Sequence, residues 1–87
     1  MDYTGMLDAE FGRYYRIRKE SIEKAYQIAL DELNDELAAY FATHGFIKKM
    51  YVGDFRGETE GHPAIIFQDF YKLSQDAVSR MKTEIRK

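Results

Sequence analysis

The sequence contains no cysteine, no tryptophan and only one proline among its 87 residues. Without thiols the chain forms no disulfide, no thiolate metal site and no thiol nucleophile. The absence of cysteine is also typical of proteins that remain in a reducing compartment. No apolar run approaches the length of about 18 residues that a membrane span needs, and the acidic N-terminus lacks the apolar segment of a secretion signal. We therefore expect a soluble, cytoplasmic protein.

The length of the chain predicts one small domain over 1–87. A domain of this size buries only about 60% of the surface of its unfolded chain, and without disulfides oligomerisation is a common compensation. Seven tyrosines and six phenylalanines are available for a core and for interfaces. The net charge of −2 gives no general attraction to nucleic acid. Composition therefore favours a folded domain that associates with itself.

The segment 21–44 carries the strongest structural pattern in the chain. Apolar and aromatic residues recur in it at steps of three and four, as on one face of a helix: Ile22, Tyr26, Ala29, Leu33, Leu37, Tyr40 and His44. No proline or glycine interrupts the segment, and Gly45 followed by Phe46 is typical of a Schellman stop. We expect a long central helix over 13–44 that ends at Thr43 or His44.

The start of this helix has two solutions. The lead-in over 1–12 favours a short helix that Asp2 or Thr4 caps, with Leu7 and Phe11 on one face. A single helix from Leu7 would measure roughly 57 Å, whereas a compact chain of this length is only about 30 Å across. Either the helix breaks between residues 12 and 21, with Ser21 as its N-cap, or it projects and is covered by another copy.

Residues 13–19, RYYRIRK, combine four cations with two tyrosines. Cations bind phosphates and tyrosines stack on bases, so this segment has candidate nucleic-acid ligands: Arg13, Arg16, Arg18 and Lys19. The alternative is a solvated helix face whose cations pair with acids one turn later, as in Arg16–Glu20 and Lys19–Glu23. Because the chain lacks a basic balance, we favour the second interpretation.

Four acids in the central helix form an acidic patch on its predicted outer face: Asp31, Glu32, Asp35 and Glu36. In a continuous helix Asp31–Asp35 and Glu32–Glu36 are like-charge pairs one turn apart, which are mildly destabilising. Such tolerated repulsion hints at a basic partner surface or at mimicry of a row of phosphates. The alternative is a face that is only solvated.

Residues 46–67 carry the pattern of a β-hairpin. β-branched and aromatic residues recur in 46–54, with imperfect alternation, and in 64–67, and a polar loop with two glycines and the only proline separates them. Asp54, Glu58, Glu60 and His62 in this loop offer oxygen and imidazole ligands, but not at the spacing of a calcium loop. We therefore expect no metal and no cofactor. Two histidines without a thiol also argue against an enzyme, so no catalytic residue is assigned.

Residues 69–87 are typical of a second helix. Asp69 or Ser74 is its expected N-cap, and one face is apolar: Phe70, Leu73, Ala77, Met81 and Ile85. The predicted fold is therefore α+β, with a long helix, a β-hairpin and a C-terminal helix packed on the first. The order of elements is α-β-β-α.

Two helices and a hairpin do not bury every tyrosine and phenylalanine of the chain. We expect four of them at an interface: Tyr14, Tyr15, Tyr51 and Phe55. The predicted function is a non-enzymatic protein–protein interaction module that self-associates and binds another protein, as inhibitors, adaptors and accessory or structural components of viral particles do. The alternative is a nucleic-acid-binding accessory protein that uses residues 13–19.

Overall fold

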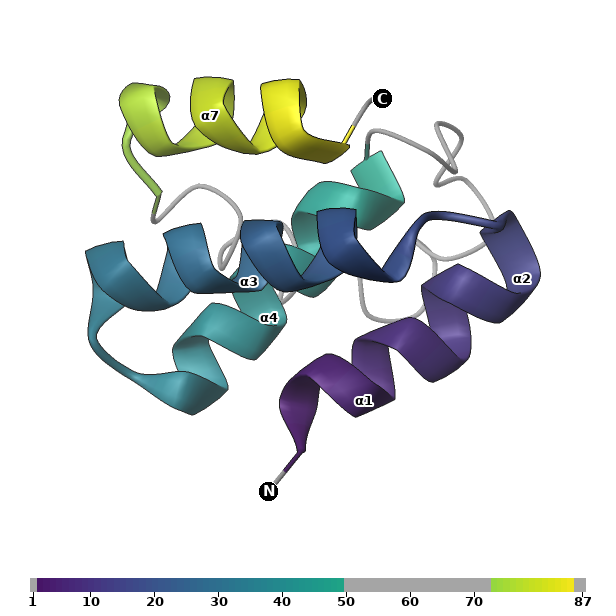
Figure 1. Ribbon diagram of the computed structural model, residues 1–87. Helices are drawn as coiled ribbons and strands as arrows, with labels where there is room; N and C mark the ends of the chain where they lie inside the picture. The colour runs from purple at the N-terminus through teal and green to yellow at the C-terminus, as the bar shows by residue number, and fades with distance from the viewer. Residues whose placement is uncertain (1, 50–72, 86–87) are drawn as a thin grey trace, which may run out of the picture.

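The computed structural model describes residues 2–49 and 73–85, which are helical apart from short connections (Figure 1). The elements in chain order are α1 (Tyr3–Leu7), the π-helical turn η1 (Asp8–Gly12), α2 (Arg13–Tyr15), α3 (Lys19–Leu33), α4 (Glu36–Ile47) and α7 (Gln75–Ile85). No strand occurs in these two ranges. The predicted α+β fold is therefore wrong for the part of the chain that the structure describes.

α1, η1 and α2 follow one another without a break and form one N-terminal helical stretch. The Asp2 side chain caps it, because its Oδ1 accepts a hydrogen bond of 2.9 Å from the amide of Gly5. Leu7 and Phe11 are fully buried. The cap at Asp2 and the shared inward face of Leu7 and Phe11 are thus confirmed.

The chain breaks its helix at residues 16–18. Arg16 adopts the left-handed conformation (φ 58°, ψ 35°) and ends α2, and Arg18 is extended and precedes α3. Between them Ile17 is buried, and its amide donates to the carbonyl of Phe11 at 3.4 Å. The break falls within the interval 12–21, but Ser21 is not the N-cap, since it lies inside α3 and is buried.

With the first break at residues 16–18 and a second at Asn34, the continuous helix predicted over 13–44 is wrong. Asn34 is left-handed (φ 55°), and Asp35 is extended and accepts a hydrogen bond of 2.9 Å from the amide of Ala38. Asparagine tolerates the left-handed conformation better than most residues, and aspartate is a favoured N-cap. The dipeptide therefore ends α3 and starts α4, although the apolar repeat continues across it.

The predicted stop at Gly45 is also wrong, because α4 continues through Gly45 to Ile47. Phe46 and Ile47 are fully buried in this arrangement. Burying two large apolar side chains, at about 1.5–3 kcal/mol each, outweighs the helix penalty of a glycine, about 1 kcal/mol. Residues 46–47 therefore belong to α4, and residues 48–49 continue as a π-helical turn, so 46–49 do not open a strand. The rest of the predicted hairpin, 50–67, lies outside the described residues.

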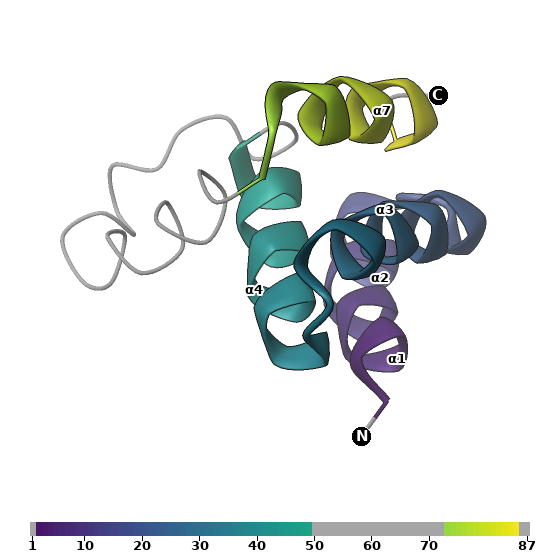
Figure 2. The same ribbon diagram turned by 90° about the vertical axis from the view of Figure 1, so that its left-hand side faces the viewer.

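α3 lies at the centre of the described core, with α7 on one side and α4 and α1 on others (Figure 2). Fully buried side chains come from every direction, including Ile22 of α3, Phe46 of α4 and Met81 of α7. Ser74 caps α7, since its Oγ accepts from the amide of Ala77 at 3.1 Å. The predicted inner face of this helix is confirmed for Leu73, Ala77, Met81 and Ile85, whereas Asp69 and Phe70 are outside the described residues.

Candidate functional site

The turn between α2 and α3 places the cations and tyrosines of residues 13–19 at one end of α3 (Figure 1). We name this segment the basic-aromatic corner. Tyr14 is 71% exposed and Tyr15 41% exposed, and the four cations are exposed as well: Arg13, Arg16, Arg18 and Lys19. Ile17 alone is buried and fixes the backbone against the core. The corner therefore presents its charged and aromatic side chains to solvent on an anchored loop.

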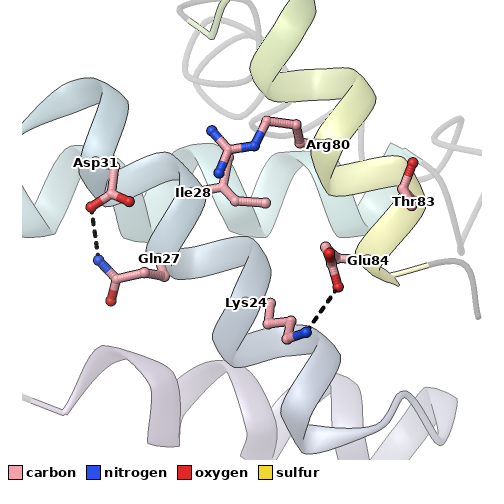
Figure 3. A pocket seen from close by; sticks show the side chains of 7 residues that line it. All are labelled: Lys24, Gln27, Ile28, Asp31, Arg80, Thr83 and Glu84. Carbon is pink, nitrogen blue, oxygen red and sulfur yellow. Dashed lines mark hydrogen bonds and ion pairs between the residues drawn. The ribbon is translucent and has the colours of Figure 1, made fainter.

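The ion pairs that would neutralise this corner in a continuous helix are not formed. Arg16 lies in the turn and not one helical turn before Glu20, so the geometry of the expected pair is lost. Lys24, which lies one helical turn after Glu20, pairs with Glu84 of α7 at 3.4 Å (Figure 3). Within the described ranges, the side chains of Arg13, Arg16 and Arg18 take part in no ion pair or hydrogen bond.

The opposite end of α3 is acidic. The turn between α3 and α4 and the residues beside it form what we name the acidic corner: Asp31, Glu32, Asp35 and Glu36. Leu37, directly after it, is 49% exposed. Because the helix breaks at Asn34, these acids do not stack as like-charge pairs along a single helix, which corrects the arrangement expected from the sequence.

Three of these carboxylates already accept hydrogen bonds, but only from neutral donors. Asp31 accepts from Gln27 Nε2 at 2.9 Å, and Asp35 caps α4. Glu32 accepts from both the amide and the hydroxyl of Ser74, with 2.7 Å between Glu32 Oε1 and Ser74 Oγ. Neutral donors leave the negative charge in place, and a carboxylate has lone pairs for further donors. The acidic corner is therefore held in place by hydrogen bonds, and no cation within residues 2–49 and 73–85 forms an ion pair with it.

The charges at the two ends of α3 run against the helix macrodipole, which favours acids at an N-terminus and cations at a C-terminus. Arg18 and Lys19 stand at the start of α3, although Glu20 in the first turn opposes them. Asp31 and Glu32 stand in its last turn, which has no basic residue. This distribution of charges therefore does not stabilise α3 through its dipole.

An open groove of about 350 Å³ lies between α3 and α7 (Figure 3). Most of its lining residues are polar or charged, although the aliphatic parts of their side chains form much of its surface: Lys24, Gln27, Ile28, Asp31, Arg80, Thr83 and Glu84. The Lys24–Glu84 and Gln27–Asp31 contacts bind lining residues to one another. Several polar groups of the groove are therefore already paired with one another within the protein. Sequence reasoning missed the groove because it depends on how α3 and α7 pack, which no local pattern reports.

A second cluster links η1 to α4. His44 Nε2 lies 3.2 Å from Glu10 Oε1, and the His44 ring packs edge-on against Phe11 with 5.0 Å between centroids. Burial, followed by the charge of Glu10, raises the pKa of the nearby Tyr40. An imidazole and a carboxylate are the groups of acid–base chemistry, but neither residue lines the groove between α3 and α7. We therefore assign the pair the role of holding the N-terminal stretch on α4. The two residues lie 34 positions apart, so a local sequence pattern could not predict their contact.

The remaining predicted site residues fall outside the described part of the chain. These are Tyr51 and Phe55 of the expected interface and the ligand-bearing loop residues Asp54, Glu58, Glu60 and His62. Within 2–49 and 73–85 no three potential metal-ligating side chains gather. No helix in these ranges combines the length and apolarity needed to cross a membrane.

Searches against models of protein families, curated proteins and solved structures found no match to this chain.

Proposed function

We propose that this chain is a non-enzymatic interaction module that associates with copies of itself and binds another protein through the basic-aromatic corner. The observation that supports it is the exposure of Tyr14 beside three arginines without a charge partner in the described ranges. Tyrosine and arginine are enriched at the residues that dominate binding energy in interfaces. The lack of cysteine supports a cytoplasmic setting.

The anchored backbone of the corner is suited to binding. Ile17 and the hydrogen bond from its amide fix the loop, so less conformational freedom is lost when a partner docks. A tyrosine ring buries on the order of 150–250 Å² in a contact, and apolar burial contributes about 25 cal/mol per Å². Tyr14, which is 71% exposed, offers most of its ring to a partner, whereas Tyr15 is 41% exposed and already stacks on Phe11. The flanking cations orient the association.

The substitution Tyr14→Ser tests this proposal. We expect the sedimentation coefficient of the wild-type protein to rise with concentration at low salt, and that of the variant to rise much less. Met6→Ser is the matched control, since Met6 is a 44% exposed apolar residue on α1, away from the corner. The proposal fails if the wild-type protein sediments as a compact monomer at tens of micromolar.

A second candidate function is a nucleic-acid-binding accessory protein that uses the cations of the same corner: Arg13, Arg16, Arg18 and Lys19. It is favoured by the missing ion pair between Arg16 and Glu20, which leaves the charge of Arg16 available for a phosphate. Fluorescence anisotropy with labelled oligo(dT) tests it. We expect affinity that falls steeply with salt and is lost in Arg16→Asn with Arg18→Ser; no binding at low salt sinks this candidate.

A further inference from the structure

The two corners carry opposite charge and lie at opposite ends of one helix. Four cations precede or begin α3, and four carboxylates stand at its end and at the start of α4. α3 has 15 residues and is therefore roughly 22 Å long. Figure 1 shows it running across the molecule from the α2 end to the turn before α4. The two corners of one copy therefore cannot contact each other.

We propose that the basic-aromatic corner of one copy docks on the acidic corner of a second copy, so that copies join head to tail. This inference rests on the proposed self-association and names the surface that the basic-aromatic corner meets. The occupant of each corner is fixed by charge complementarity. No cation in the described ranges forms an ion pair with a carboxylate of the acidic corner. The basic-aromatic corner of the same copy lies at the other end of α3 and does not reach it.

The apolar parts of the two corners are complementary as well. Tyr14 is exposed among arginines in one corner, and Leu37 is exposed beside Glu36 in the other. An apolar centre with a charged rim is the usual anatomy of an interface. Docking would cover both exposed side chains and place each set of charges against the opposite sign, which orients the encounter.

The charge distribution of α3 gives independent support. Cations at its start and acids at its end oppose the helix dipole, so the dipole of α3 does not account for their placement. Between two copies the same arrangement is attractive, because the negative end of one α3 faces the positive end of the next. The contact uses two different surfaces and is therefore heterologous. Copies joined in this way form a ring where the rotation between them closes, and otherwise an open chain with one free corner at each end.

Two variants separate the corners without disturbing the local backbone. In the basic-corner variant Arg16→Asn keeps a residue that tolerates the left-handed conformation, and Arg18→Ser places a favoured N-cap before α3. In the acidic-corner variant, Asp31→Asn and Glu36→Gln remove charge with nearly unchanged shape. Asp35 and Glu32 are left in place, because they cap α4 and hold Ser74.

Sedimentation velocity at low salt is the measurement. We expect each variant alone to self-associate at least about tenfold more weakly than the wild-type protein, as for loss of complementary interface charges. An equimolar mixture retains one intact corner of each kind, so we expect a complex with one copy of each variant. Lys82→Glu and Glu23→Lys change the net charge by the same amounts at exposed positions outside both corners, and we expect both to assemble like the wild-type protein.

The outcomes distinguish this inference from the proposed function. If the wild-type protein associates but the acidic-corner variant associates equally well, or the mixture forms no complex, the head-to-tail contact is wrong and self-association stands. A monomeric wild-type protein overturns both. Circular dichroism melts establish that the variants fold. Tyr14→Ser and Leu37→Ser provide a second pair for the same mixing experiment, independent of charge.

Discussion

Arg16 is the residue that sets the direction of the chain between α2 and α3. It is one of two non-glycine residues with positive φ in the described ranges, at 58°. The left-handed conformation costs a residue with a Cβ roughly 1–2 kcal/mol. The burial of Ile17 next to it supports this conformation, because Ile17 reaches the core only if the helix ends here. Arg16 is therefore an exposed cation at a left-handed position that would favour glycine on backbone energetics alone.

We predict that Arg16→Gly raises the free energy of unfolding by about 0.5–1 kcal/mol, because glycine adopts the left-handed conformation without strain. The same substitution should weaken self-association, since it removes a cation of the basic-aromatic corner. Urea unfolding and sedimentation measure the two effects. The control is Arg13→Gly, which places glycine at a right-handed helical residue (φ −73°) and should lower stability by about 1 kcal/mol. Equal losses in both variants would contradict the assignment of strain to Arg16.

At the scale of the element, side-chain caps mark where α1, α4 and α7 begin, whereas α3 has no side-chain cap. Asp2, Asp35 and Ser74 each accept a hydrogen bond from an amide in the first turn of their helix. The caps at Asp2 and Ser74 could be predicted because each precedes a clear apolar pattern. The cap at Asp35 was hidden, because the apolar repeat of 21–44 keeps its register across Asn34.

The cap at Asp2 predicts how the first helix responds to acid. The hydrogen bond from the Gly5 amide, and then that from the Thr4 hydroxyl, lowers the pKa of Asp2 below its usual 3.8. Because the pKa is lower in the folded state than in the unfolded state, the cap stabilises α1 at neutral pH. This stabilisation is lost as the pH falls below the usual pKa and through the lowered pKa of the folded state. NMR titration should show the Asp2 carboxyl titrating below pH 3.8, with the Gly5 amide shift following the same curve. A midpoint at or above the usual value would contradict the cap.

The end of α4 shows why the fold class could not be predicted. Gly45 and Phe46 match a local stop signal, but the helix continues because Phe46 and Ile47 gain complete burial against distant parts of the chain. That gain depends on tertiary packing and is invisible in the local pattern. The same reason hid the Lys24–Glu84 and Glu10–His44 contacts, which join elements far apart in sequence.

The candidate site, in contrast, was largely accessible to sequence reasoning at the residue level. The segment 13–19 was identified from its cations and tyrosines, and Tyr14 and Tyr15 are exposed in the structure. The sequence allowed a break between residues 12 and 21 but did not place it at Arg16, where it removes the expected pairing with Glu20. The hydrophobic periodicity does not show where a turn falls when the burial of one side chain, here Ile17, against distant parts of the chain decides its position.

At the scale of the whole molecule, the chain has a net charge of only −2 but a strong separation of charge along α3. A small net charge alone suggests a surface that attracts neither cationic nor anionic partners strongly. The two corners, however, give the molecule a positive and a negative end. An attraction between exposed charges is screened by salt within about 10 Å at 0.1 M and about 3 Å at 1 M. Assembly through the corners should therefore depend steeply on ionic strength.

Sedimentation velocity of the wild-type protein over a range of concentrations, at low salt and again near 1 M salt, tests this account most directly. We predict a sedimentation coefficient that rises with concentration at low salt, and a single boundary of a compact monomer at high salt. A monomer under both conditions would contradict self-association. An assembly that persists unchanged at high salt would contradict a contact between oppositely charged corners.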